Sequence, residues 1–464
     1  MGILYLKSPL AVQNIYWSLR GLEYKLVKEG TLFRKLLSEL EKNQYAGEEA
    51  LRGYQDRKLK SLVAHCYENV PYYHDLFRRL KLKPGDITGQ DDLWKVPCTT
   101  KEEIRTHGSQ FIARTANRMF IRKARTSGTT GKPLALYRDR FSTVFENAMI
   151  WRLYRWAGVS PGDRIATLRG CLVQAIDDME GSFWRHNLPL RRLIMSSYHI
   201  NTDTASKYLE ALKEFSPVAI EAYPSSIYSL ARHLKANGVE GLPLKAVFTS
   251  SETLYGFQRE AIEGFFRCRI FDLYGSAERV CAAGSCEHGS YHLFGDYGIT
   301  EFREIESGNG GRVFEIVGTG LHNYAMPILR YRTEDLAFLP DRGFSCRCRR
   351  GFPFIKKVES YRVDEHLTTS DGRLLQSVEQ MAEGLENVLE YQVVQEGPAF
   401  VRIRVVTSRE FCRKDENLII RKAQERLGSS MRMAVEQVDA IERTKNGKYP
   451  FIVNKLRSAQ ANQT

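Results

Sequence analysis

Between residues 164 and 275, short apolar runs alternate with amphipathic stretches, and this alternation restricts the fold more than any other feature of the chain. The apolar runs contain many β-branched residues and predict strands: RIATL, PVAIEAY, KAVFTSS and RIFDLYG. The intervening stretches have the apolar spacing of helices: ASKYLEALKEF, SSIYSLARHLKA and YGFQREAIEGFF. Strands that alternate with helices in this way predict parallel β-α-β units and an α/β fold.

The segments on either side predict a larger and a smaller domain. Residues 1–60 place apolar side chains at helical spacing and predict a helical N-terminal segment. Between residues 310 and 340, the runs GRVFEIV and PILRYRTEDLAFL predict antiparallel strands. After residue 357 the order becomes helix, strand, strand, helix, strand, as in a small α+β unit. We therefore expect a large N-terminal domain with mixed or parallel sheets, residues 1–357, and a small C-terminal α+β domain, residues 358–464.

The composition is that of a globular protein with a basic surface. Hydrophobic residues make up 43% and charged residues 27%, which excludes a disordered or collagen-like chain. The 68 Lys and Arg residues exceed the 55 Asp and Glu residues by 13. This excess fits a nucleic acid, an anionic membrane surface or a phosphate-bearing substrate, or it is simply solvated. Because no nucleic-acid-binding motif is found, we expect no specific nucleic-acid partner.

The termini and cysteines predict the compartment. No apolar run reaches the roughly 18 residues of a membrane span, and the N-terminus lacks a signal-peptide pattern. We expect a cytoplasmic protein, in which clustered members of the nine cysteines are metal ligands or catalytic groups. Aromatic and basic residues near Tyr16, Trp17 and Lys25 allow peripheral contact with a membrane. The alternative is that this segment packs on its own domain.

The most informative motif is T-S-G-T-T-G-K-P. It comprises Thr126, Ser127, Gly128, Thr129, Thr130, Gly131 and Lys132, followed by Pro133. Glycines let backbone N–H groups approach a polyphosphate, hydroxyls donate hydrogen bonds, and the lysine adds positive charge. The motif is not a Walker A loop, which requires Gly at position 126 and Ser or Thr at position 133. We interpret it as a phosphate-covering loop; the alternative is an ordinary surface turn.

This string resembles the phosphate-loop signature of adenylate-forming enzymes. The blocks NVPYY (69–73), VPCTTK (96–101) and SSE (250–252) resemble the phenylacetate–CoA ligase branch. Within that branch the chain is most similar to CapK-like proteins of capsule and polysaccharide gene clusters. The resemblance implies an AMP-forming acyl or aryl ligase that uses ATP and Mg²⁺. It would activate a small carboxylic acid as an acyl-adenylate and transfer the acyl group to CoA or to an amine, which suggests a role in polysaccharide biosynthesis.

The resemblance also assigns the nucleotide contacts. In the Y-G-S-A-E motif, with Ala277 at the usual Thr position, Tyr274 would stack on adenine beside Gly275 and Ser276, and Glu278 would help to hold Mg²⁺. The alternative for Tyr274 is an ordinary core aromatic.

A second motif, Y-R-T-E-D, would bind the ribose through Asp335, with Glu334 at the usual Gly position. Ser251 and Glu252, and also Tyr223, end predicted strands and are expected along the nucleotide and acyl pocket. Asp335 and these strand ends could instead be ordinary turns.

The C-terminal part would complete the site. In the R-T-K-N-G-K motif, Lys448 matches the family lysine that swings in to bind the reacting carboxylate and the α-phosphate. Between the domains, Arg362 matches a residue that reaches the ribose, and Asp364 would lie at the pivot of a mobile small domain. Tyr361 stands at the hinge where many relatives carry glycine, so we expect a stiffer hinge.

Four scattered residues predict a zinc site. Cys286, His292, Cys346 and Cys348 would supply the three thiolates and one imidazole of a closed tetrahedral structural site. Cys281 and His288 are alternative ligands, and independent reduced cysteines are the alternative to a metal. The alternative to the ligase as a whole is a non-catalytic nucleotide-binding scaffold of a biosynthetic complex. The sequence assigns neither the acid nor an oligomeric state.

Overall fold

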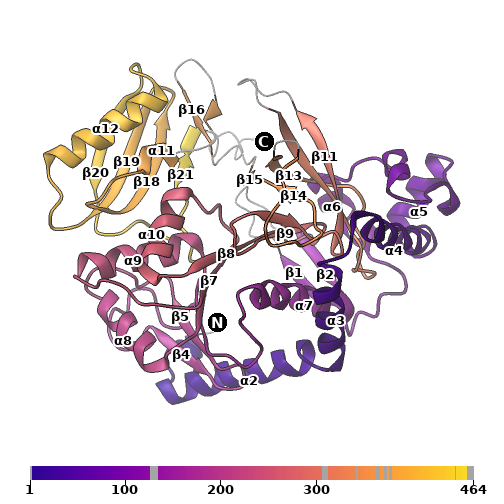
Figure 1. Cartoon of the computed structure of the whole chain (residues 1–464), viewed down its shortest axis with the longest axis horizontal. Helices are drawn as coiled ribbons and strands as arrows, with labels where there is room; N and C mark the ends of the chain where they lie inside the picture. Colours follow the sequence, from indigo (N-terminus) through magenta and orange to yellow (C-terminus); the bar gives the residue numbers. More distant parts are fainter. Residues whose placement is uncertain are drawn as a thin grey trace. The chain divides into compact units, whose positions relative to one another are not determined.

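The computed structural model of the chain describes residues 3–125, 134–305, 312–340, 343–360, 366–369, 374–375, 379–444 and 446–456. The chain divides into two compact units, whose elements are labelled in Figure 1. Unit 1 comprises Met1–Leu22, Gly162–Ile270 and Ser360–Thr464, and unit 2 comprises Glu23–Pro161 and Phe271–Glu359. The domain boundary that the sequence predicts after residue 357 stays a prediction. Within the described ranges, no helix has both the length and the apolar character to cross a membrane.

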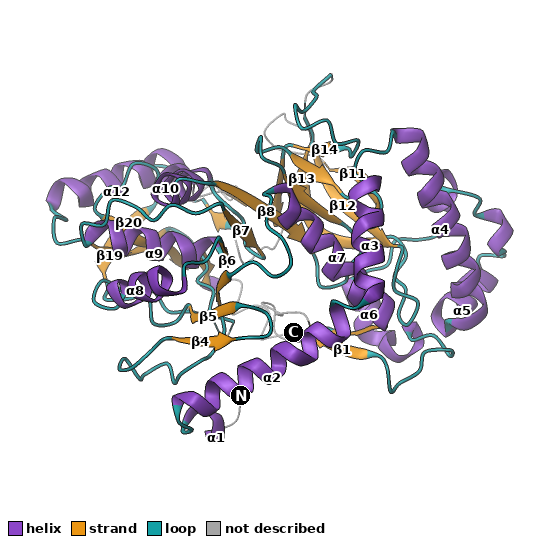
Figure 2. Cartoon of the chain, turned by 60° about the horizontal axis from the view of Figure 1, so that its bottom comes forward, coloured by secondary structure: helices purple, strands orange, loops and turns teal. Residues whose placement is uncertain are grey.

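Five neighbouring strands of unit 1 follow the order β7-β6-β3-β5-β4. Strands β3, β5, β6 and β7 are parallel, and β4 is antiparallel to β5. Their bounds are β3 Ile165–Arg169, β4 Trp184–Asn187, β5 Arg192–Ser196, β6 Ala219–Ala222 and β7 Ala246–Ser250. Helices accompany these strands in Figure 2: α8 Ala205–Phe215, α9 Pro224–Ala236 and α10 Gly256–Phe266. The alternation of strands and helices predicted from the sequence is confirmed, and β7 is buried along its whole length.

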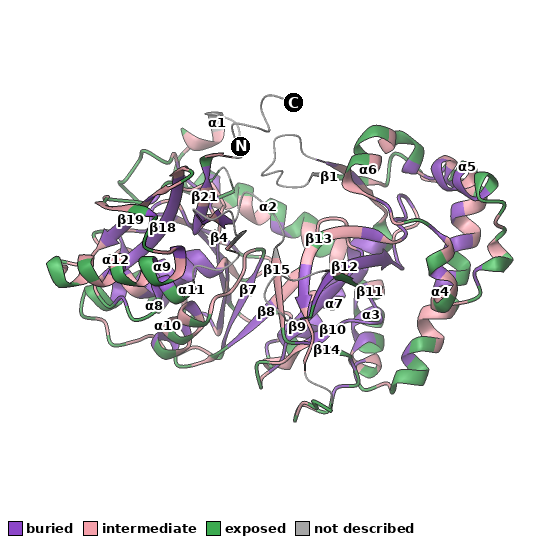
Figure 3. Cartoon of the chain, turned by 90° about the horizontal axis from the view of Figure 1, so that it is seen from above, coloured by how far each residue is buried: buried purple, intermediate pink, exposed green. Residues whose placement is uncertain are grey.

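The C-terminal part of unit 1 is a four-stranded sheet in the order β20-β19-β18-β21. Its elements are β18 Val388–Gly397, β19 Phe400–Thr407, α12 Arg413–Leu427, β20 Arg432–Gln437 and β21 Ile452–Asn454, preceded by β16 Leu367–Thr368, β17 Leu374–Leu375 and α11 Glu379–Ala382. Figure 3 shows β18 largely buried while α12 exposes one face. The first helix expected after residue 357 is described only as the short α11. Strand β21, which pairs with β18 in parallel, was not predicted, because three residues show no measurable periodicity.

Unit 2 combines helices with antiparallel strands. Its helices include α3 Thr31–Asn43, α4 Glu48–Asn69, α5 Pro71–Arg79, α6 Lys101–His107 and α7 Arg140–Trp156; α1 Ile3–Leu6 lies in unit 1, and α2 Leu10–Lys28 begins there. Three short 3₁₀ helices span Pro84–Asp86, Gln90–Lys95 and Gly108–Phe111. One pair of strands is β1 Arg122–Arg125 with β2 Ala135–Arg138, and a second group is β8 Arg269–Gly275, β9 Ala282–Ser285, β10 Tyr291–Leu293 and β14 Phe354–Ile355. The third group is β11 Gly298–Ile305, β12 Val313–Gly320, β13 Tyr331–Phe338 and β15 Lys357–Ser360. The helical N-terminal segment and the antiparallel strands near residues 310–340 are therefore confirmed.

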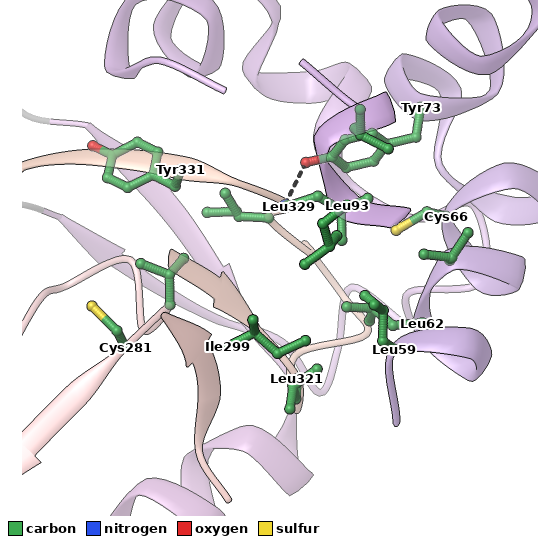
Figure 4. Close-up of a cluster of buried hydrophobic side chains, with 14 of the residues drawn as sticks. Leu59, Leu62, Cys66, Tyr73, Leu93, Cys281, Ile299, Leu321, Leu329 and Tyr331 are labelled. Carbon is green, nitrogen blue, oxygen red and sulfur yellow. Dashed lines mark hydrogen bonds between the residues drawn. The ribbon is translucent and has the colours of Figure 1, made fainter. Parts of the chain in front are cut away.

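The core of unit 2 joins its helices to its strands (Figure 4). Leu59 and Leu62 of α4 lie in one buried cluster with Ile299 of β11. Within it, the backbone N–H of Leu329 donates to the hydroxyl of Tyr73 at 2.8 Å. Because this buried phenol is satisfied by the segment that leads into β13, the helical layer fixes where β13 begins.

Candidate functional site

Two tyrosines and two carboxylates link the Y-G-S-A-E and Y-R-T-E-D motifs in unit 2. Tyr274, near the end of β8, donates its hydroxyl to Oδ2 of Asp335 at 2.9 Å. Tyr331, at the start of β13, donates to Oε1 of Glu278 at 2.8 Å. Each motif therefore supplies one tyrosine donor and one carboxylate acceptor, and the structure brings together residues that the sequence predicts for one site.

The surroundings of Tyr274 suit a polar ligand. Burial and the negative charge of Asp335 raise the pKa of Tyr274 well above its usual value, so the phenol stays protonated and keeps donating. Gly275 is exposed, and the buried Oγ of Ser276 has no hydrogen-bond partner among the described residues. A buried hydroxyl that protein groups leave unused is expected where a ligand supplies the partner.

Glu334 stands where the resembled family carries glycine, and its backbone explains that preference. Its φ is 60°, in the left-handed region that glycine adopts freely and that costs other residues roughly 1–2 kcal/mol. The pairing of β12 with β13 shifts opposite Ile316, whose carbonyl accepts a hydrogen bond from Oγ1 of Thr333 at 2.9 Å. This β-bulge lies directly before Asp335, so the unusual backbone precedes the carboxylate that meets Tyr274.

Eight of the expected binding residues lie outside the described part of the chain: Thr126, Ser127, Gly128, Thr129, Thr130, Gly131, Lys132 and Arg362. Their roles stay predictions. The strands that flank the first seven in the sequence, β1 and β2, pair antiparallel from Arg125 with Ala135 to Arg122 with Arg138. A strand, β2, therefore begins shortly after the T-S-G-T-T-G-K-P motif in the sequence.

In unit 1, Lys448 reaches the ends of β6 and β7. Its Nζ donates to the backbone carbonyl of Ser251 and lies 5.0 Å from the ring centroid of Tyr223. A tight turn precedes it, in which the N–H of Gly447 donates to the carbonyl of Thr444 at 2.8 Å. The ammonium group therefore lies where parallel strands end, the usual place for ligands in open α/β sheets.

Two glycine backbones make this placement possible. A Cβ on Gly170, which follows β3, would lie 1.7 Å from the carbonyl oxygen of Asn446. A Cβ on Gly447, whose φ is 74°, would lie 2.4 Å from Oγ of Ser197. The same Oγ donates to the carbonyl of Gly447 at 2.9 Å. The segment before Lys448 is thus seated against the sheet by backbone contact that only glycine permits.

Glu252 lies beside Lys448 but is held by another strand end. Its carboxylate accepts hydrogen bonds from the backbone N–H of Ser225 at 2.9 Å and from its Oγ at 3.0 Å. Burial raises the pKa of Glu252, and the charge of Lys448 opposes that rise. The structure therefore brings Tyr223, Ser251, Glu252 and Lys448 together in unit 1, whereas Tyr274, Glu278 and Asp335 gather in unit 2.

Arg169, at the end of β3, was missed by the sequence analysis. Its guanidinium lies 5.3 Å from the ring centroid of Tyr223, pairs with Glu221 at 3.1 Å and donates to Oγ of Ser250. The signal was present as the single arginine that directly follows the apolar run RIATL. A charged residue at the end of a buried strand points to a site at that edge of the sheet.

Three thiols and one imidazole form a compact cluster in unit 2. Sγ of Cys286 lies 3.5 Å from Sγ of Cys346, and Sγ of Cys348 lies 3.2 Å from Nε2 of His292. All four donor atoms lie within 4.8 Å of one another, as the ligands of a tetrahedral zinc ion do. The alternative ligands lie outside this cluster, and Sγ of Cys281 instead contacts the hydroxyl of Tyr274 at 3.9 Å.

The geometry can be compared with known proteins. Residues 367–455 match the family described as the CapK C-terminal domain. The chain is 24% identical to Protein CapK of Staphylococcus aureus over 98% of its own length and 100% of that relative. It is 28% identical to the phenylacetate-coenzyme A ligase of Thermus thermophilus over 64% of its own length and 68% of that ligase.

Solved structures share the fold. A 2-hydroxyisobutyryl-CoA ligase in the postadenylation state, in complex with R3-HIB-AMP, superposes with a TM-score of 0.69. The match covers 91% of this chain and 93% of that chain at 17% sequence identity. The same ligase in complex with 2-HIB-AMP superposes with a TM-score of 0.65 at 18% identity. The large α/β part and the small C-terminal α+β part thus occur together in a known fold.

Proposed function

We propose that this chain, a member of the adenylate-forming superfamily, activates a small carboxylic acid with ATP and transfers the acyl group to CoA. Within the superfamily it is a phenylacetate–CoA ligase-like and CapK-like AMP-forming ligase. The observation that supports this most is Lys448, whose ammonium group lies at the ends of two parallel strands beside Tyr223 and Ser251.

In the proposed first step, a carboxylate oxygen of the acid attacks the α-phosphorus of ATP. The bond between that phosphorus and the bridging oxygen to the β-phosphate breaks, and pyrophosphate leaves with both electrons. Lys448 binds the reacting carboxylate and the α-phosphate, and its positive charge stabilises the negative charge that spreads over these oxygens. In the second step, a thiolate attacks the acyl carbon and AMP leaves.

The two linked motifs of unit 2 are proposed to hold the nucleotide. Asp335 accepts hydrogen bonds from the ribose hydroxyls while it still accepts one from Tyr274. The ring of Tyr274 stacks on adenine, and Oγ of Ser276 donates to the nucleotide. Glu278, oriented by Tyr331, is a hard oxygen ligand for Mg²⁺, which would neutralise charge on the phosphates. The loop Thr126–Lys132 and Arg362 complete this proposal from the sequence alone.

Zinc is proposed as a structural ion held by Cys286, His292, Cys346 and Cys348. The compact donor set supports this proposal, since four protein ligands fill a tetrahedral shell and leave no position for a substrate. The ion would tie the hairpin of β9 and β10 to the residues around Cys346.

A second acceptor of the acyl group, with a role in polysaccharide biosynthesis, is a further part of the proposal. An amine of a polysaccharide precursor is the alternative acceptor to CoA, which follows from the CapK-like resemblance of the sequence. The non-catalytic scaffold is the less supported function, because Lys448 lies against Ser251 at the strand ends that are proposed to bind the acid.

Peripheral membrane contact is proposed for α2. Its residues Val12, Ile15, Leu19 and Leu22 are 50%, 58%, 62% and 45% exposed, and their spacing places them on one helical face. Such a face binds anionic lipid surfaces when basic residues accompany it, as Arg20 and Lys25 do here. Flotation with phosphatidylglycerol vesicles should recover the wild type, whereas Ile15→Ser with Leu19→Ser should stay with the soluble fraction. Equal recovery of both proteins would refute the contact.

The activity is tested by ATP–pyrophosphate exchange with a panel of carboxylic acids, followed by mass spectrometry of the adenylates formed. We expect exchange with at least one acid and an adenylate of the corresponding mass. Absence of exchange with every acid, together with nucleotide binding that persists, would favour the scaffold.

A further inference from the structure

Four cations gather in unit 2 where the sequence analysis predicted no site. We call Lys28, Arg122, Arg138 and Arg279 the cation cluster. Lys28 ends α2, Arg122 begins β1, Arg138 ends β2, and Arg279 directly follows Glu278. The charges of the three arginines all act on Lys28, so these groups lie within electrostatic range of one another.

Backbone carbonyl groups hold two of the arginines, Arg138 and Arg279, in place. Arg138 donates to the carbonyl of Ala277 at 2.5 Å, directly before Glu278 in the chain. Arg279 donates to the carbonyl of Ser142 at 3.1 Å. Arg138 is thus anchored to the backbone directly before Glu278, and Arg279 directly follows Glu278 in the chain, so both arginines neighbour the carboxylate proposed to hold Mg²⁺.

The positive charge of the cluster is only partly neutralised. Arg279 pairs with Glu146 at 3.6 Å, and that carboxylate also accepts the hydroxyl hydrogen of Tyr297. Arg122 pairs with Glu23 at the surface, at 3.1 Å. In the described ranges, no carboxylate lies within ion-pair distance of the remaining two cations, Lys28 and Arg138.

Lys28 shows the consequence of this imbalance. Its Nζ lies 4.2 Å from the ring centroid of Tyr24. Burial, and then the charges of Arg279 and Arg122, lower the pKa of Lys28 to about 8, although Glu146 opposes the shift. Burial and Arg279 also lower the pKa of Arg138. Half-buried cations that repel one another in this way are stabilised by a bound anion.

We propose that the cation cluster binds the β- and γ-phosphates of ATP and the pyrophosphate that leaves. This inference rests on the proposed function, which supplies ATP and Mg²⁺. Arg138 contacts the backbone of Ala277, which directly precedes Glu278, and Arg279 directly follows Glu278, so the cluster neighbours the proposed metal ligand. Lys28 comes from a helix outside all the motifs of the resemblance and is a further binding residue of this chain.

The test is direct binding of inorganic pyrophosphate to the full chain by calorimetry, with Mg²⁺ and without any acid. We expect Lys28→Gln and Arg138→Gln each to weaken pyrophosphate binding by at least about tenfold. Lys28→Arg, which keeps the charge, should bind nearly as the wild type does. The control is Lys35→Gln, since the side chain of Lys35 is 74% exposed and meets only Glu39 at 3.9 Å.

The pH dependence supplies a second readout. A bound polyanion raises the pKa of Lys28, so pyrophosphate binding by the wild type should take up protons near pH 8 and weaken as the pH rises above it. Lys28→Gln should lose this proton uptake. Unchanged pyrophosphate affinity in both glutamine variants would overturn the proposal. So would variants that lose affinity only for adenosine 3′,5′-bisphosphate, which mimics the phosphorylated adenosine part of CoA.

Failure of this inference differs from failure of the proposed function. Pyrophosphate exchange with the acid panel, measured on the same proteins, reports the function. Cluster-dependent pyrophosphate binding without exchange would support the inference and refute the ligase activity, whereas exchange that is insensitive to Lys28→Gln and Arg138→Gln would refute the inference alone.

Discussion

Gly170 and Gly447 meet backbone to backbone: a Cβ on Gly447 would lie 2.4 Å from the Cα of Gly170. The contact seats the turn before Lys448 against the end of β3, and so it decides where the ammonium group stands. Gly170 lies outside the motifs of the sequence analysis, yet it determines the position of the residue proposed to be most important for adenylation.

We therefore expect Gly170→Ala to slow acid-dependent pyrophosphate exchange by at least about tenfold, since displacement of a reacting group by about 1 Å has effects of this order or larger. The methyl group would push the backbone of Asn446 away from the sheet. Gly264→Ala is the control, because a Cβ there meets nothing within 4 Å and helix α10 favours alanine. Wild-type exchange by Gly170→Ala would show that the close approach is dispensable.

Lys448→Ala should reduce kcat for adenylate formation by about 100- to 1000-fold and leave KM for ATP nearly unchanged, because the lost charge acts on the transition state. Rapid-quench measurement of adenylate with a fixed acid separates the two parameters. Lys414→Ala, at an exposed position of α12, is the matched control. An unchanged kcat for Lys448→Ala would remove Lys448 from the proposed chemistry.

Cys348→Ser should abolish zinc binding and lower the unfolding midpoint by at least about 5 °C, because a structural ion stabilises only the folded chain. The readouts are metal content by mass spectrometry and thermal unfolding with and without chelator. Cys412→Ser is the control, since Cys412 is exposed and is not in the donor cluster. Purified wild type without zinc, or full zinc content in Cys348→Ser, would contradict the assignment.

Because of Glu390, we expect the free energy of unfolding of unit 1 to fall at acidic pH. Its buried carboxylate pairs with Arg443 at 3.0 Å and accepts a hydrogen bond from Ser229 at 2.5 Å. Although burial opposes it, the charge of Arg443, with His233, lowers the pKa of Glu390 to about 2. Because the pKa of Glu390 is lower in the folded chain, its carboxylate contributes fully to the free energy of unfolding above the unfolded-state pKa of 4.5. This contribution is lost as the pH falls towards 2.

Glu390→Gln should therefore reduce the free energy of unfolding by about 3 kcal/mol near pH 6, and by progressively less between about pH 4.5 and 2. Urea unfolding of both proteins across this range gives the difference directly. Glu425→Gln, exposed on α12, should match the wild type throughout. A constant difference at every pH would mean that Glu390 acts through packing instead of charge.

Much of the fold followed from local patterns. The runs PVAIEAY and KAVFTSS became β6 and β7, and ASKYLEALKEF became α8 with the predicted bounds. Buried parallel strands and amphipathic helices leave strong local signals, because each is patterned by the faces that it must bury. The three-residue β21 leaves no such signal, since it is too short to show a period, and it forms by pairing with the distant strand β18.

The sequence by itself identified the chemically informative motifs: Tyr274 with Asp335, Lys448, and the four donors of the proposed zinc site. Only the tertiary structure decided which charges stand together, as with Arg169 beside Tyr223 and Lys28 beside Arg279. The physical reason is that periodicity and motif spacing record short-range constraints along the chain. Electrostatic proximity depends on how distant segments pack, and a lone Lys or Arg looks the same in a sequence whether it faces solvent or a phosphate.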